Sequence, residues 1–138
     1  IGNIFYKIAK KVGVYFEFST NEKVAMEAAI GASFSGLKTL VAMKNFGLNL
    51  AIEPLIPFVY TGSVGPTVII CADDPSCHSS AQTEQNSRGY AYLSHIPMLE
   101  PSDPQECYDL TIQTNNTALY VIYVVFFLEF IIKKFIFF

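Results

Sequence analysis

The stretch "STNEKVAMEAAIGASFSGLKTLVAMK", from Ser19 to Lys44, joins a predicted helix to a predicted strand. Its small apolar residues recur three and four positions apart, which is the spacing of one helical face, at Val24, Ala25, Ala28, Ala29 and Ala32. Gly36 then ends the helix, and "KTLVAMK" has the composition of a strand. We therefore predict a helix over 22–37 and a strand over 38–44. The helix interior is Ala and Gly rather than Leu, which lets another backbone or a ligand approach closely.

The flanking sequence continues this alternation of helices and strands. We predict a helix over 1–12, a strand over 14–18, a loop and apolar helix over 45–62, a strand over 66–74, a polar loop over 75–89, a short helix over 90–95, a strand and turn over 97–103, and a helix that begins at Pro104. Pro54 and Pro57 predict a kink or a break in the apolar helix. This order predicts an α/β fold, a three-layer α-β-α domain with a mostly parallel sheet.

Ligands of parallel sheets bind beyond the carboxyl ends of the strands, where three stretches of this sequence fall. These stretches are Ser19–Glu22, Lys44–Gly47 and Asp73–Glu84. The 75–89 loop is longer than a plain connector, so it is a candidate ligand-facing loop, with a simple solvated loop as the alternative. Its His78-Ser79 pair does not indicate a hydrolase, because no nucleophile motif surrounds it. Asp73 and Asp74 suit Mg²⁺ by residue type, but a strand end with a helix cap explains them better.

Composition excludes several classes of function. The 138 residues suffice for one ordinary domain, and the net charge of -3 with no basic stripe makes nucleic acid an unlikely partner. The cysteines (Cys71, Cys77 and Cys107) form no CxxC pair, and with two histidines they do not make a zinc site. We expect no bound metal in this segment, and three reduced thiols in a cytoplasmic protein.

The two ends of the sequence differ from its middle. The start at Ile1, without a signal-peptide pattern, leads us to expect a part of a longer protein. Residues 113–138 end in an apolar run that is short for a membrane span and carries Glu129, so a membrane partner is not favoured. A tail anchor, a buried element and a frameshift or read-through product remain the interpretations of this tail. We prefer the last, with the domain ending at residue 112.

Glu22 has two interpretations from its surroundings alone. Ser19-x-x-Glu22 is a capping-box pattern, and Thr20 or Asn21 could equally be the helix cap. A carboxyl group at a strand-to-helix junction, beside a helix of small residues, could instead meet a heteroaromatic nitrogen and exchange a proton with it. The capping interpretation is the simpler one from the motif alone.

Two longer stretches carry a family resemblance. "NEKVAMEAAIGASFSGLKTLVAMKNFGLN" and "ADDPSCHSSAQTEQNSRGYAYLSHIPMLEPSDPQECYDL" resemble the 2-oxoacid:ferredoxin oxidoreductases, above all the branch that oxidises indolepyruvate. The resemblance covers 1–112 and implies a partial pyrimidine-binding domain of a thiamine diphosphate enzyme. The domain would be incomplete at its N-terminus, because the preceding strand and Gly-Pro-Thr-Ser-Ser loop of the family are missing. It implies oxidative decarboxylation of a 2-oxoacid, an arylpyruvate such as indolepyruvate, to an acyl-coenzyme A.

The resemblance also implies cofactors and partners. Thiamine diphosphate would be shared with a separate domain that holds the diphosphate and Mg²⁺, and [4Fe-4S] clusters would lie elsewhere in the full enzyme. Ferredoxin, coenzyme A, the 2-oxoacid and a beta subunit would be the partners. Alone, the segment is expected to be inactive. The alternative is a tail-anchored or regulatory α/β module that binds a small molecule without catalysis.

The resemblance assigns roles to named residues. Glu22 matches the glutamate that contacts N1' of the aminopyrimidine and so promotes deprotonation of the thiazolium. The residues expected beside the aminopyrimidine are Lys44, Asn45, Phe46 and Gly47. The residues expected near the thiazolium and substrate are His78, Ser79, Ser80, Glu84 and Gln85, although the loop differs by one residue from the family's between Ser80 and Glu84.

Overall fold

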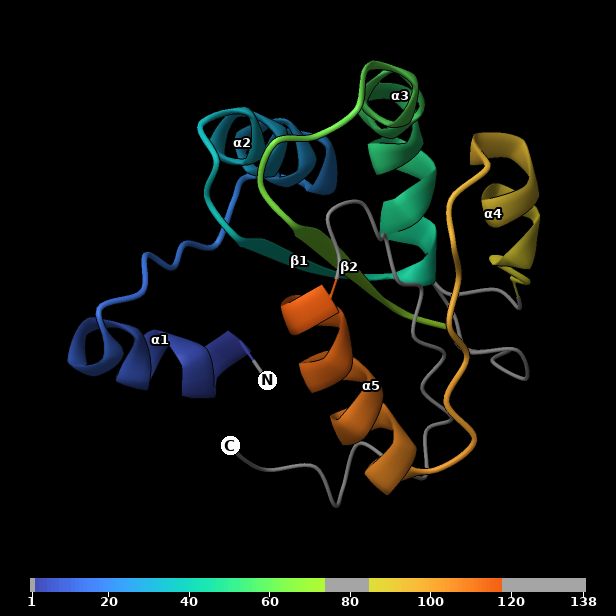
Figure 1. The fold of residues 1–138 in the computed structure, drawn as a ribbon. Coiled ribbons are helices and arrows are strands. Elements are labelled where there is room, and N and C mark those ends of the chain that lie inside the picture. Colours follow the sequence, from blue (N-terminus) through green and yellow to red (C-terminus); the bar gives the residue numbers. More distant parts are fainter. Residues whose placement is uncertain (1, 74–84, 118–138) are drawn as a thin grey trace.

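The computed structural model describes residues 2–73 and 85–117. The elements in this part of the chain are α1 (Gly2–Val12), α2 (Glu22–Phe34), β1 (Thr39–Lys44), α3 (Asn45–Thr61), β2 (Thr67–Ala72), α4 (Arg88–Ser94) and α5 (Pro104–Thr117) (Figure 1). Each predicted helix is present, with an end shifted by a few residues at most. The predicted loop at the start of the apolar helix is wrong, because α3 begins at Asn45, directly after β1.

The sheet of the described residues has two parallel strands, with Thr39 opposite Thr67 and Lys44 opposite Ala72. Helix α3 forms the crossover between them, as in a βαβ unit. Helices α2 and α3 lie on one side of the sheet, and α5 packs on β2 from the other side (Figure 1). The predicted α/β class with a parallel sheet is therefore confirmed. The pairing also brings the carboxyl ends of both strands side by side.

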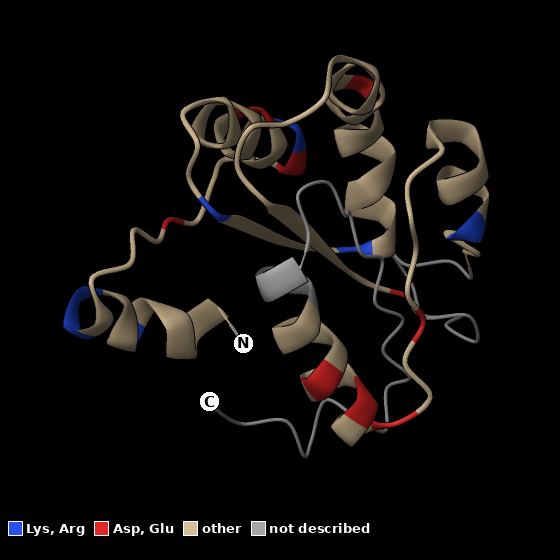
Figure 2. Ribbon diagram, in the orientation of Figure 1, with Lys and Arg blue, Asp and Glu red and all other residues tan. Residues whose placement is uncertain are grey.

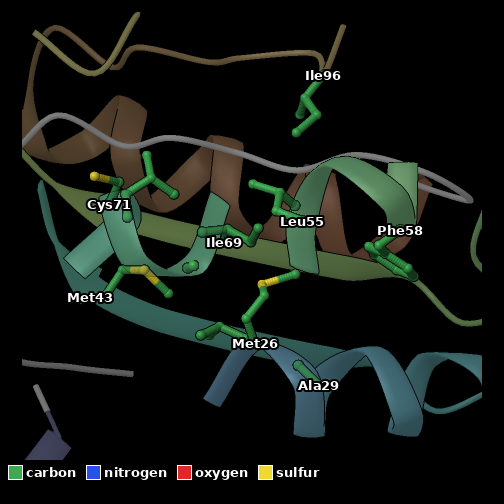
Figure 3. Packing of buried hydrophobic residues seen from close by; sticks show 11 residues of the cluster. Met26, Ala29, Met43, Leu55, Phe58, Ile69, Cys71 and Ile96 are labelled. Carbon is green, nitrogen blue, oxygen red and sulfur yellow. The ribbon is translucent and has the colours of Figure 1, made fainter. Parts of the chain in front are cut away.

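The hydrophobic core lies between the sheet and the two helices above it. Figure 3 shows Met26 and Ala29 of α2 facing Leu55 of α3 and Ile69 of β2. Met26 and Ile69 are fully buried, and Ala51 and Leu48 extend the same cluster. The small side chains of α2 let this helix pack directly against α3, which fixes the first turns of both helices relative to each other.

Two predicted strands are wrong. Residues 14–18 pair with no strand of the described part of the chain; instead Phe16 and Phe18 pack against the rings of Phe5 and Tyr6 on α1. Aromatic composition favours a strand only where the edge of another strand is available for pairing. Here the aromatic rings pack against one another instead. Residues 97–103 are irregular as well, because Pro97 and Pro101 cannot donate to a strand ladder.

Helix α3 continues through both of its prolines, so the alternative of a break is wrong. Its axis changes direction along its length in Figure 1, as expected where a proline removes a backbone donor. Helix α5 runs to Thr117, across the predicted boundary at 112, and residues 118–138 lie outside the described part of the chain. No helix between residues 2 and 117 that the structure describes is long and apolar enough to cross a membrane. Figure 2 shows Lys and Arg scattered over several elements.

Candidate functional site

Glu22 is the first residue of α2, and Asn21 caps this helix. The Asn21 backbone is extended, and its Oδ1 accepts a hydrogen bond from the Val24 N–H at 2.9 Å. Ser19 donates to Glu17 at 2.6 Å instead of to the helix. The Ser19–Glu22 capping box is therefore wrong, and the Asn21 alternative is confirmed. The Glu22 carboxylate is half-buried, and no described residue hydrogen bonds with it.

Glu22 lies against Gly47 in the first turn of α3. A Cβ atom built on Gly47 would be 2.6 Å from the Glu22 Cγ and 2.9 Å from its Oε1, closer than real Cβ contacts. Only glycine at position 47 leaves room for this carboxylate. The structure thus brings Ser19–Glu22 and Lys44–Gly47 together, but only Lys44–Gly47 lies at the end of a strand, because the strand predicted before Ser19 is not present in the described residues.

Gln85, which lies between β2 and α4, is hydrogen bonded to Asn45 at the start of α3. The Asn45 side chain is buried, and its Oδ1 accepts from the Phe46 N–H at 2.9 Å. The Asn45 carbonyl oxygen accepts from Gln85 Nε2 at 3.0 Å. Phe46 is 45% exposed and Lys44 is half-buried.

A buried polar group lies between the end of β2 and the start of α4. Asp73, at the end of β2, is 2% exposed and accepts from the Ser87 N–H at 3.0 Å. Ser87 directly precedes α4, so the predicted strand end with a helix cap describes Asp73 well. The Cys71 thiol donates to Ser87 Oγ at 3.8 Å, and burial raises its pKa to about 12. Cys71 is thus an inert thiol beneath the site.

Several predicted site residues are not placed. His78, Ser79, Ser80 and Glu84 lie outside the described residues, and their roles stay predictions. In the described part of the chain no three His, Cys, Asp or Glu side chains could hold a metal ion together. Three residues that contact Gln85 or its partners were not among the predicted site residues: Asn49, Ser87 and Tyr90. A polar Asn49 within the apolar sequence of α3 is a signal that could have revealed one of them.

Comparison with known proteins decides the family. Residues 3–133 match the family model described as pyruvate flavodoxin/ferredoxin oxidoreductase, thiamine diphosphate-binding. The chain belongs to this family. The family resemblance predicted from the sequence is confirmed by this match and by the relatives.

The relatives include long oxidoreductase subunits. The chain is 52% identical over 106 residues to the indolepyruvate oxidoreductase subunit IorA of Methanothermobacter marburgensis, covering 77% of the chain and 17% of that protein. It is 51% identical over 104 residues to IorA of Thermococcus kodakarensis, covering 75% of the chain and 16% of that protein. It is thus similar to about one sixth of the length of each subunit.

A solved structure shows the same fold. A 2-oxoglutarate:ferredoxin oxidoreductase from Magnetococcus marinus, with 2-oxoglutarate, coenzyme A and succinyl-CoA bound, superimposes with a TM-score of 0.75 at 20% identity. The alignment covers 89% of this chain and 23% of that one. The α/β architecture of the chain is therefore that of one portion of a much larger oxidoreductase chain.

Proposed function

We propose that the chain is the pyrimidine-binding portion of a thiamine diphosphate-dependent 2-oxoacid:ferredoxin oxidoreductase with an arylpyruvate, indolepyruvate above all, as its substrate. Family membership supports the cofactor, and about 50% identity to proteins named indolepyruvate oxidoreductase supports the substrate class. A binding module without catalysis is not favoured by these relatives. The division into a domain over 1–112 and a separate tail over 113–138 is also part of the proposal.

The contact between Glu22 and Gly47 carries the proposal. A half-buried carboxylate without a described hydrogen-bond partner can exchange a proton with a ring nitrogen placed beside it. Gly47 gives Glu22 its place, since any side chain there would displace it. When bound, thiamine diphosphate supplies the electron sink for decarboxylation of the 2-oxoacid. The residues present fit that cofactor at its aminopyrimidine end.

The residues around Glu22 and Gly47 have proposed roles in positioning, cofactor binding and substrate binding. Asn45 and Gln85 fix the backbone that carries Gly47, and Phe46 offers an exposed aromatic ring beside it. Lys44 completes the proposed cofactor-binding group. The proposed substrate-facing residues are His78, Ser79, Ser80 and Glu84, together with Gln85.

We assign the other functions of the enzyme to parts of the assembly outside the described residues. We assign Mg²⁺ and the diphosphate to another domain, as the family resemblance of the sequence implies. The [4Fe-4S] clusters and a beta subunit would likewise lie elsewhere in the assembly, which would use coenzyme A and pass electrons to ferredoxin. Free thiols at Cys71 and Cys107 agree with a cytoplasmic location.

Replacing Glu22 with glutamine in the assembled oxidoreductase tests this function. Glu22→Gln keeps the size of the side chain but cannot exchange a proton, so turnover of indolepyruvate should fall about 100-fold or more. Glu27→Gln is the matched control, because Glu27 lies on the same helix, is exposed and only pairs with Lys23 at 3.9 Å. Near-normal turnover of Glu22→Gln would disprove the role of Glu22.

A further inference from the structure

Gln85 is held by hydrogen bonds whose direction is fixed by one backbone group. The Asn45 carbonyl oxygen can only accept, so the Gln85 side chain must turn its Nε2 toward it, at 3.0 Å. The Gln85 Oε1 then faces Asn49, whose Nδ2 donates to it at 3.0 Å. The Asn49 Oδ1 is left to accept from the Tyr90 hydroxyl. Each donor and acceptor along this series follows from the one before it.

The residues of this series come from three parts of the chain. Asn45 and Asn49 are one turn apart on α3, Gln85 lies between β2 and α4, and Tyr90 lies on α4. The Tyr90 ring packs against the hydrophobic core, which anchors the end of the series. Ser87 also accepts from Gln85 Nε2, at 3.3 Å, and is held by Asp73. The Gln85 amide is therefore surrounded by groups that allow one orientation.

We propose that Asn49 and Tyr90 are positioning residues for the reaction: they hold the Gln85 amide on the Asn45 carbonyl and so fix the first turn of α3. This proposal rests on the proposed function, because its consequence is at Glu22. Asn45 begins the helix turn that contains Gly47, and Gly47 sets the place of the Glu22 carboxylate. If Asn49 no longer donates, the Gln85 amide loses its fixed orientation and its hold on Asn45.

Substitutions in the assembled oxidoreductase test this proposal. Asn49→Leu removes the donor without adding charge, and Tyr90→Phe removes a single oxygen atom from a packed ring. Gln85→Met removes the amide itself. Because each variant weakens the hold on the Asn45 carbonyl, each should lower kcat about three- to tenfold. KM for the 2-oxoacid should stay unchanged in Asn49→Leu and Tyr90→Phe, since neither residue is a proposed substrate-facing residue. Gln105→Leu is the control, since Gln105 is exposed on α5 and donates only to Asp109.

A second measurement does not depend on the loaded enzyme. Amide hydrogen exchange of the peptide that covers 44–50, measured without cofactor, should rise in all three variants and stay unchanged in Gln105→Leu. The exchange of α5 should not change in Asn49→Leu, Tyr90→Phe or Gln85→Met, which separates a local effect on α3 from a general loss of stability.

The double variant decides whether Asn49 acts through Gln85. Asn49→Leu combined with Gln85→Met should be no worse than Gln85→Met alone, in both kcat and exchange. Additive effects, or unchanged exchange of 44–50 in the single variants, would overturn the proposal. The exchange result stands even if Glu22→Gln retains activity, so failure of the proposed function and failure of this inference are distinguishable.

Discussion

The Glu22 side chain lies directly against the backbone of Gly47, so that a Cβ at position 47 would fall 2.6 Å from the Glu22 Cγ and 2.9 Å from its Cδ. The two residues are brought together by the packing of α2 against α3. The absence of a side chain at Gly47 therefore leaves the space that the Glu22 side chain occupies.

Gly47→Ala should impair activity more than it impairs folding. The added methyl group would push the Glu22 side chain, which is flexible and only half-buried, rather than a rigid backbone. Because a displacement of about 1 Å at a reacting group can cost about 100-fold in rate, we expect a loss of that order in kcat of the assembled enzyme. Steady-state kinetics and the melting temperature measure the two effects.

Gly31→Ala is the matched control for this prediction. Gly31 lies within α2, and nothing lies within 4 Å of a Cβ built there. This variant should keep full activity and gain up to about 1 kcal/mol of helix stability. If Gly47→Ala were as active as Gly31→Ala, the Glu22–Gly47 contact would have no part in catalysis.

Gly65→Ala should destabilise the fold itself. A Cβ at position 65 would lie 2.1 Å from the Leu37 carbonyl oxygen, which belongs to rigid backbone. Gly65 is also held to Ser33 by two hydrogen bonds, of 2.8 Å through its N–H and 2.7 Å through its carbonyl oxygen. We expect a loss of about 3 kcal/mol in the free energy of unfolding, seen as a lower melting temperature of the complete subunit.

Gly89→Ala provides the comparison, because a Cβ at Gly89 meets nothing within 4 Å. It should leave the melting temperature unchanged or raise it slightly. Equal melting temperatures for Gly65→Ala and Gly89→Ala would show that the turn before β2 adapts to a side chain.

The sequence predicted the elements better than their pairing. Helix spacing located α2, and a continuous apolar run located β2, because both patterns are local. The strand predicted over 14–18 failed because pairing needs a distant partner edge, and nearby rings on α1 satisfied Phe16 and Phe18 instead.

The sequence also predicts only those parts of the candidate site that depend on local patterns. The element order located Lys44–Gly47 correctly at the end of a strand. Glu22 follows no strand among the described residues, and it lies beside Gly47 because α2 packs against α3. The hydrogen bond from Gln85 to the Asn45 carbonyl joins residues 40 positions apart, and no local pattern encodes it. Its further support by Asn49 and Tyr90 depends on how α3 and α4 are arranged in space.

Cys71 should resist alkylation in the folded protein. Burial raises the pKa of this thiol from its ordinary value of 9.0 to about 12, and the thiolate is the reactive form. At pH 8 the labelling of Cys71 by iodoacetamide, followed by peptide mass spectrometry in the complete subunit, should be far slower in buffer than in urea. Equal rates in the two conditions would contradict a buried thiol.

The raised pKa of Cys71 predicts that the free energy of unfolding decreases at high pH. Between pH 9 and about 12 the unfolded chain loses the Cys71 proton while the folded chain keeps it. The contribution of Cys71 to stability is therefore complete below pH 9 and decreases as the pH rises, by at most about 1.4 kcal/mol per pH unit. Cys71→Ser should flatten this part of the curve of melting temperature against pH.

Asn21→Ala should weaken the start of α2, since Asn21 Oδ1 accepts from the Val24 N–H at 2.9 Å. Loss of such a cap costs about 1 kcal/mol, which should appear as faster amide hydrogen exchange at Val24 in the complete subunit. Ser19→Ala is the control, because the Ser19 hydroxyl donates to Glu17 and does not cap the helix. If Ser19→Ala accelerated exchange at Val24 and Asn21→Ala did not, the helix would be capped by Ser19, and Glu22 would belong to a capping box rather than to the proposed site.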